Sequence, residues 1–177
     1  VDHRARAIGA VNTVVNREGR LTGYNTDIDG LIYLARRAGV ELAGKKTVIL
    51  GSGGTSRTAQ AAAKALGAAE IAVISRRGED NYDNLSRHAD AQVLINTTPV
   101  GMFPRCGQAP VSLSLFPDLT GVLDVVYNPL HTALLLEAEA RGLPCSCGLP
   151  MLVAQAKRAA ELFTGASIPD SRTEEIL

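Results

Sequence analysis

A glycine-rich loop between two apolar segments is the feature that most constrains the fold of this chain. Residues 46–50 form a β-branched run typical of a buried strand, and the alanine-rich residues 55–66 are typical of a helix. The connection between them, residues 51–55, reads Gly-Ser-Gly-Gly-Thr. Glycine there permits a sharp turn and lets backbone N–H groups approach a phosphate, toward which the helix would direct its positive end. The sequence therefore predicts a dinucleotide-binding loop.

The end of the next predicted strand bears on which dinucleotide binds. That strand, residues 70–75, leads into Ser-Arg-Arg, where an NAD-binding fold would place Asp or Glu for the ribose hydroxyl. Cations there suit a 2′-phosphate, so we expect NADP as the cofactor. The acidic residues 79–80 reduce the expected preference in affinity for NADP over NAD. Ser56 occupies the third glycine position of the GxGxxG pattern. The alternative is a glycine turn that packs a strand against a helix and binds no ligand.

The composition limits the class of protein. A length of 177 residues suits one well-buried domain with some extra structure. The 18 basic and 18 acidic residues cancel, which gives no support to nucleic-acid or acidic-membrane binding. No apolar run is long enough to cross a bilayer and no signal peptide opens the chain, so we expect a cytoplasmic protein. The three cysteines are odd in number and lack CxxC spacing, so we expect neither a disulfide framework nor a metal site.

Strands and helices alternate along the chain from residue 46 onward. Such alternation, with apolar runs buried on both faces, predicts an α/β fold: a Rossmann-type, doubly wound parallel sheet with helices on both sides. Ligands of such sheets bind beyond the carboxyl ends of the strands. Upstream, a strand pair at 10–16 and 21–24 precedes a helix at 27–38. The predicted strands of the sheet lie at 46–50, 70–75, 91–96, 121–126 and 143–147, and the helices at 55–66, 81–88, 131–141 and 150–164.

Six motifs, spread over nearly the whole length, carry a resemblance to a known family. They are residues 8–13 (IGAVNT), 23–27 (GYNTD), 51–57 (GSGGTSR), 96–102 (NTTPVGM), 124–129 (DVVYNP) and 148–156 (GLPMLVAQA). In kind and in order they resemble the motifs of the shikimate dehydrogenases, including the quinate/shikimate dehydrogenases. The resemblance implies reversible hydride transfer between NADPH and the carbonyl carbon of 3-dehydroshikimate, which gives shikimate. An enzyme like methylene-tetrahydrofolate dehydrogenase is an alternative that the Asn-Thr-Asp motif and Gln155 disfavour.

The resemblance also implies roles for single residues. Asp27 would be the carboxylate of a catalytic Lys–Asp pair. Four polar side chains would bind the substrate: Asn12, Asp27, Tyr127 and Gln155. The cofactor would be bound through its pyrophosphate, its 2′-phosphate and its nicotinamide by Gly51, Ser52, Gly53, Gly54, Thr55, Ser75, Arg76, Arg77, Thr97, Val125 and Gly148.

Taken without the resemblance, these polar side chains have simpler explanations. Asp27 stands at the start of a predicted helix and could cap it. Gln155 could be a polar residue satisfied by a loop, and Tyr127 a half-buried aromatic with its hydroxyl in water. The resemblance favours the functional assignment for each of them.

The resemblance divides the chain into three parts. We expect a remnant of a substrate-binding domain at 1–27, an NADP-binding Rossmann domain at 28–150, and C-terminal helices at 151–177 that pack back toward the substrate side. The remnant's strand pair would lack the sheet that it joins in the family. Because such an edge favours pairing with another chain, we expect a tendency to form a homodimer.

Two functional elements of the family have no counterpart here. Its Ser-x-Ser motif, which binds the substrate carboxylate, and its catalytic Lys should both precede Asn12, and no segment of this sequence resembles them. We therefore expect a fragment that supplies the cofactor-binding part of the enzyme and, alone, turns over weakly or not at all. The alternative is a non-catalytic NADP-binding module.

Overall fold

The structure is a computed structural model, and it describes all residues from 1 to 177. Its main feature is a five-stranded sheet in which every pair of neighbouring strands is parallel. The side chains of its central strands are buried, which is why their sequences read as continuous apolar runs. The strand order is β4 (Glu70–Ile74), β3 (Lys46–Leu50), β5 (Val93–Asn96), β6 (Gly121–Asp124) and β7 (Cys145–Ser146). The predicted α/β fold with a Rossmann-type parallel sheet is confirmed.

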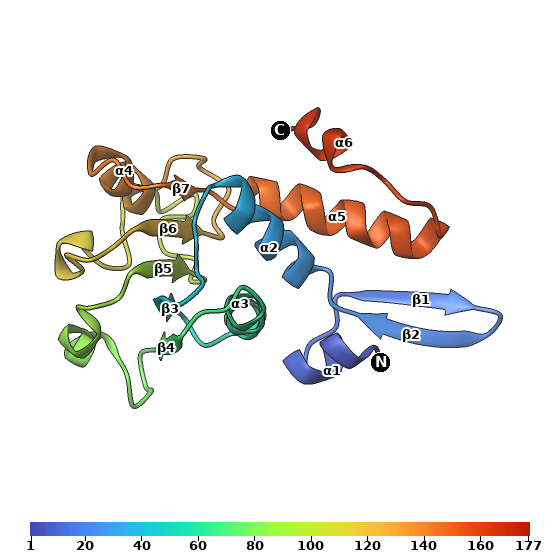
Figure 1. Ribbon diagram of the computed structural model, residues 1–177, viewed down its shortest axis with the longest axis horizontal. Helices are drawn as coiled ribbons and strands as arrows, with labels where there is room; N and C mark the ends of the chain where they lie inside the picture. The colour runs from blue at the N-terminus through green and yellow to red at the C-terminus, as the bar shows by residue number, and fades with distance from the viewer.

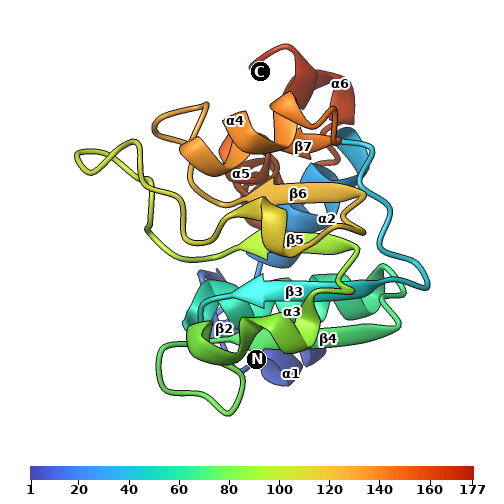
Figure 2. The same cartoon turned by 90° about the vertical axis from the view of Figure 1, so that its left-hand side faces the viewer.

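Helices cover both faces of this sheet (Figure 2). Alternate residues of each strand enter opposite cores, so that Ile49 and Ile95 lie in one core and Val48 and Leu94 in the other. The first core is completed by α1 (His3–Ile8), α2 (Asp27–Arg37), α3 (Gly54–Ala65) and α5 (Leu149–Thr164). The second is completed by η1 (Tyr82–His88), η2 (Leu113–Leu115) and α4 (Ala133–Ala140).

A separate antiparallel hairpin is formed by β1 (Thr13–Arg17) and β2 (Arg20–Tyr24). Figure 1 shows it standing away from the large sheet, with α2 and α3 between them. The short C-terminal helix α6 (Asp170–Glu174) packs against α5. None of the helices is both long and apolar enough to cross a membrane.

Several elements differ from those predicted by the sequence. The apolar pattern does not predict the short helices α1, η2 and α6, because pieces of three to six residues are too short to show a period. Only the resemblance implies helices in the segment 151–177 that contains α6. Strand β7 has two residues rather than five. Pro144, which precedes it, has no N–H group and contributes only its carbonyl, to Val122 N. The predicted helix at 81–88 is a 3₁₀ helix with a kink at Asn84.

The strand order places a break in winding between β3 and β5. From β3 the chain crosses to β4 on one side, and from β4 it returns to β5 on the other side of β3. Loops that leave two such neighbouring strands diverge, and the crevice between them is where open α/β sheets bind ligands. We therefore expect a ligand site between the loops that begin at Gly51 and Thr97.

The helices α2 and α5 cross in close contact at Gly30. A Cβ atom at this position would lie 2.6 Å from the backbone oxygen of Met151 and 3.2 Å from Cβ of Gln155. Because Gly30 has no side chain, the two helices can approach until their backbones almost touch. This crossing brings Gln155 near the N-terminal end of α2.

We expect Gly30→Ala to destabilise the fold. Overpacking costs about 1–3 kcal/mol, which exceeds the gain of up to about 1 kcal/mol from replacing glycine by alanine in a helix. Urea unfolding should therefore show a lower midpoint. Gly54→Ala is the control, because no atom lies within 4 Å of the added Cβ. Equal stability of the Gly30 variant and the unaltered protein would contradict the close crossing.

Candidate functional site

A pocket of about 560 Å³ lies at the winding break, beyond the carboxyl ends of three strands. The loop after β3 contributes the glycines, the end of β4 contributes Ser75 and Arg76, and the loop after β5 contributes residues 97–100. Predicted cofactor residues that line it are Gly51, Ser52, Gly53, Ser75, Arg76 and Thr97. Gly54 and Thr55 begin α3 next to this lining, whereas Arg77 does not line the pocket. Tyr82, which also lines it, is a residue that the sequence analysis missed.

The loop after β3 is fixed to both neighbouring strands. Gly51 N donates to the carbonyl of Ile74 at 2.8 Å, and the Thr97 hydroxyl donates to the carbonyl of Leu50 at 2.6 Å. Gly51 has a φ of +106°, and a Cβ atom there would lie 2.7 Å from Thr97 Oγ1. Only glycine satisfies both conditions without strain. The predicted sharp turn at Gly51 is present.

The N-terminus of α3 opens into unfilled space. Gly53 is its N-cap residue, and no side chain caps the first turn. No atom lies within 4 Å of a Cβ built at Gly53 or Gly54. The packing of the protein does not require glycine at these two positions, so the missing side chains leave room beside free backbone N–H groups. These are the conditions under which a helix N-terminus accepts a phosphate, and the pyrophosphate of a dinucleotide fits them.

Arg76 gives the pocket a fixed positive charge close to an aromatic ring. Burial raises the pKa of the Tyr82 hydroxyl, while the nearby Arg76 guanidinium lowers it. Both side chains line the same cavity as the glycine loop. The arrangement offers a planar apolar surface and a cation at one end of the pocket, which suits a nucleotide with an extra phosphate.

Val125 and Gly148 meet at a second place on the same edge of the sheet. Gly148 N donates to the carbonyl of Val126 at 2.9 Å. A Cβ atom at Gly148 would collide with the carbonyl of Val125, so the fold itself requires glycine there. The two predicted nicotinamide residues are therefore neighbours.

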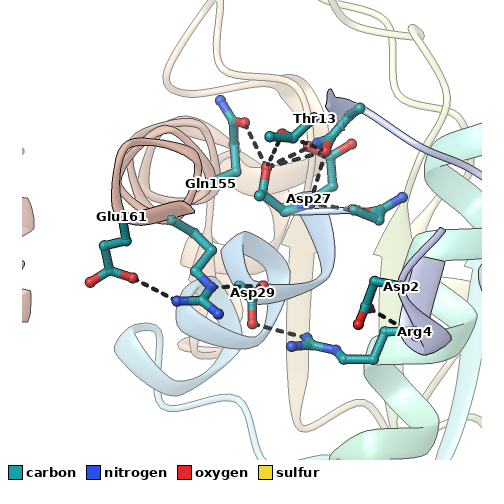
Figure 3. A network of polar contacts seen from close by, with 11 residues as sticks. Asp2, Arg4, Thr13, Asp27, Asp29, Gln155 and Glu161 are labelled. Atoms are coloured by element: carbon teal, nitrogen blue, oxygen red, sulfur yellow. Dashed lines mark hydrogen bonds and ion pairs between the residues drawn. The ribbon is translucent and has the colours of Figure 1, made fainter. Parts of the chain in front are cut away.

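Two predicted substrate residues, Asn12 and Gln155, form hydrogen bonds with Thr26 at the start of α2. Figure 3 shows Gln155 and Asp27 in this network. Asn12 Oδ1 accepts from Thr26 N at 2.9 Å, and Asn12 Nδ2 donates to the Thr26 hydroxyl at 3.1 Å. The same hydroxyl donates to Gln155 Oε1 at 3.2 Å. Asp27 follows Thr26 directly. The sequence analysis missed Thr26 as the link, although it lies inside the GYNTD motif.

Asp27 is the first residue of α2 and does not cap it. Thr26 occupies the N-cap position without a capping hydrogen bond from its side chain, and Asn25 Oδ1 accepts from Asp27 N at 3.1 Å. The capping explanation for Asp27 is therefore wrong. Burial raises the pKa of the Asp27 carboxyl, and a hydrogen bond from the Asn12 side chain lowers it. The Asp27 side chain is half-buried.

Tyr127 lies in the loop after β6 and is 47% exposed. No hydrogen bond joins it to Asn12, Asp27 or Gln155. A half-buried aromatic with its hydroxyl in water therefore stays an alternative for this residue, beside the predicted role in substrate binding.

A chain of ion pairs lies beside this cluster and joins three helices (Figure 3). Arg4 of α1 binds Asp29 of α2 at 2.9 Å, and Arg158 of α5 lies 3.9 Å from the same carboxylate and 3.0 Å from Glu161. These pairs connect α1 with the two helices that carry Asp27 and Gln155.

Comparison with known proteins gives the family. No family model matches the chain. A curated shikimate dehydrogenase (NADP(+)) of Clostridium perfringens is 35% identical over 189 residues, which cover 99% of this chain and 70% of that protein. The chain belongs to the shikimate dehydrogenase family. The predicted family is confirmed, and membership in it supports an oxidoreductase. The chain spans about 70% of the length of this relative.

Solved shikimate dehydrogenases have the same fold. The enzyme of Thermus thermophilus, in complex with NADP(H) and shikimate, is 36% identical with a TM-score of 0.86, covering 98% of this chain and 69% of that one. The enzyme of Listeria monocytogenes, in complex with shikimate and NAD, is 32% identical with a TM-score of 0.84, covering 99% and 70%. Members of the shikimate dehydrogenase family with this architecture have thus been solved with either dinucleotide.

We expect Asp27→Asn to stabilise the protein in a pH-dependent way. The folded pKa of Asp27 lies above the ordinary value of 3.8 because the carboxyl is buried, so ionisation favours the unfolded state. The stability gained by the variant should be absent below pH 3.8 and should grow as the pH rises through the raised pKa. Urea unfolding of both proteins across this range measures the difference.

Asn12→Ala sharpens this test. Removing the hydrogen bond that lowers the pKa of Asp27 should shift the same transition to higher pH. A stability difference between the Asp27 variant and the unaltered protein that is independent of pH would contradict the burial of this carboxyl.

Proposed function

We propose that this chain binds NADP in the pocket at the winding break and takes part in the reversible oxidation of shikimate to 3-dehydroshikimate. One observation carries the proposal: the glycine loop, the open N-terminus of α3 and the Arg76 side chain belong to a single cavity. A plain structural turn would need Gly51 but would not need open space at Gly53 and Gly54.

Each part of the dinucleotide has residues suited to it. The N–H groups from Gly51 to Thr55 would bind the pyrophosphate, and Arg76, assisted by Ser75, would bind the 2′-phosphate. Thr97 would contact the dinucleotide between its adenosine half and its nicotinamide half. Val125 and Gly148 would flank the nicotinamide. The nicotinamide supplies or accepts the hydride. The relative crystallised with NADP(H) supports NADP as the cofactor. The relative crystallised with NAD agrees with only a small preference for NADP over NAD.

The cluster around Thr26 would hold the polyol substrate. Asn12 and Gln155 present amide groups that can donate to and accept from hydroxyl groups, and Tyr127 would add its hydroxyl. Asp27 would accept the proton of the substrate hydroxyl that is oxidised. Its raised pKa suits this task, because a base works best when its pKa approaches the working pH.

A second candidate function is a non-catalytic NADP-binding module, and the positions of the lysines favour it for these residues alone. Of the four lysines, Lys45 binds Thr120, Lys46 binds Glu70 and Asp90, and Lys157 binds Asp170. Lys64 lies in the last turn of α3. No ion pair or hydrogen bond joins any of these lysines to Asp27, so its carboxylate has no lysine partner among these residues. A cytoplasmic location and pairing into a homodimer stay predictions from the sequence.

We expect Arg76→Ala to weaken NADP binding selectively. Losing a charge-assisted contact to the 2′-phosphate costs roughly 1.5–3 kcal/mol, about 10- to 150-fold in Kd. NAD affinity should change little, because NAD lacks that phosphate. Titration calorimetry with both dinucleotides measures the ratio, and Arg20→Ala, on the exposed hairpin, is the matched control. Equal binding of NADP and NAD by the unaltered chain refutes the assignment.

We expect these 177 residues alone to oxidise shikimate slowly. Without a cationic partner for Asp27, the rate should fall about 10²–10⁴ below that of a complete enzyme such as the Thermus thermophilus relative. NADPH formation at 340 nm, with about millimolar shikimate, gives both rates. Asp27→Ala should abolish any residual rate. Turnover comparable to that of the relative would show that the catalytic cation lies within these residues.

A further inference from the structure

One buried carboxylate on the ligand-binding edge has no role in the proposed chemistry. Asp124 ends β6 and is fully buried. Its carboxylate has no cationic partner, and three uncharged donors surround it. Asn96 Nδ2 and Val126 N donate to Oδ1 at 2.9 and 3.0 Å, and the Thr132 hydroxyl donates to Oδ2 at 2.8 Å. A buried charge of this kind is costly unless the groups that it holds matter.

The first donor connects Asp124 to the loop after β5. Asn96, also fully buried, accepts at Oδ1 from Thr98 N at 3.0 Å and from the Thr98 hydroxyl at 2.7 Å. Thr98, in turn, lies between Thr97 and Pro99 on the wall of the dinucleotide pocket. The path from the carboxylate to this wall contains only two hydrogen bonds.

The second donor connects Asp124 to the loop after β6. Val126 N binds the carboxylate, while the carbonyl of Val126 accepts from Gly148 N at 2.9 Å. Val126 therefore links the carboxylate to Gly148, which lies against Val125. The third donor, Thr132, caps α4 through Leu135 N at 3.3 Å and does not line the pocket.

We propose that Asp124 is a positioning residue that holds the loops after β5 and β6 at the spacing one dinucleotide needs in order to contact both. It touches neither cofactor nor substrate and acts through Asn96 and Val126. A carboxylate suits this position because all three neighbours donate to it, two of them to one oxygen. Asparagine would retain one oxygen for Asn96 and Val126 and would turn its amide toward Thr132.

The test compares Asp124→Ala, Asp124→Asn and Val122→Ala, measuring NADPH affinity by fluorescence at a temperature where each variant is folded. Val122 is a fully buried residue of the same strand, so its variant reproduces a loss of stability without touching the carboxylate. We expect Asp124→Ala to raise the Kd at least about tenfold, and Asp124→Asn and Val122→Ala to stay within about threefold of the unaltered protein. An unchanged Kd in Asp124→Ala overturns the proposal.

A second pair of variants covers the case in which Asp124→Ala does not fold. Asn96→Ala breaks only the connection to the loop after β5, and Thr132→Val breaks only the connection to α4. The first should weaken NADPH binding about tenfold and the second should leave it within about threefold. Unchanged affinity in Asn96→Ala, or equal weakening in both variants, would overturn the proposal.

The affinity measurement rests on the proposed function, so amide hydrogen exchange supplies an independent measurement. In Asp124→Ala, or in Asn96→Ala if the former does not fold, the amide of Thr98 should exchange about tenfold faster, whereas the amide of Ile49 in β3 stays protected. Absence of NADPH binding in the unaltered protein would refute the proposed cofactor and leave this exchange result to decide the positioning role. An unchanged exchange rate of the Thr98 amide in the variant would overturn the positioning role of Asp124.

Discussion

Parallel strands can be joined only by crossovers, because each connection must return from the carboxyl end of one strand to the amino end of the next. In this chain the crossover from β3 leads to one side and the crossover from β4 leads to the other. The loops that leave β3 and β5 therefore diverge, and neither connection can close the space between them. The pocket, the glycine loop and the proposed cofactor site all depend on this single change of direction.

Three close approaches of the backbone then shape the site, and each of them requires a glycine. Gly51 lies against Thr97, Gly148 against Val125, and Gly30 against Met151. The first two set the shape of the sheet edge where the dinucleotide would lie. The third brings α5 to α2 and with it Gln155 to Thr26. The proposed cofactor and substrate regions are thus built by the same means, the removal of side chains where two segments must nearly touch.

The sequence predicts the elements of the sheet because their apolar runs are long and their glycine ends are distinct. The local pattern does not place α6, whose contacts come from far along the chain: Glu174 binds Arg37 across 137 residues and also binds Tyr33. The residues of the site were predictable as motifs, but their connections were not. Thr26 and Gln155 are 129 positions apart, and nothing local in either motif shows that one hydroxyl bridges them. The network of Asp124 was likewise hidden, because an aspartate at the end of an apolar strand also suits a turn.

The most direct test of the account is a crystal structure of this chain grown with NADP⁺. The account predicts electron density for the 2′-phosphate beside Arg76, the pyrophosphate at the N-terminus of α3, and the nicotinamide between Val125 and Gly148. A dinucleotide bound away from the loop that begins at Gly51, or crystals that contain none at concentrations well above the measured Kd, would contradict it.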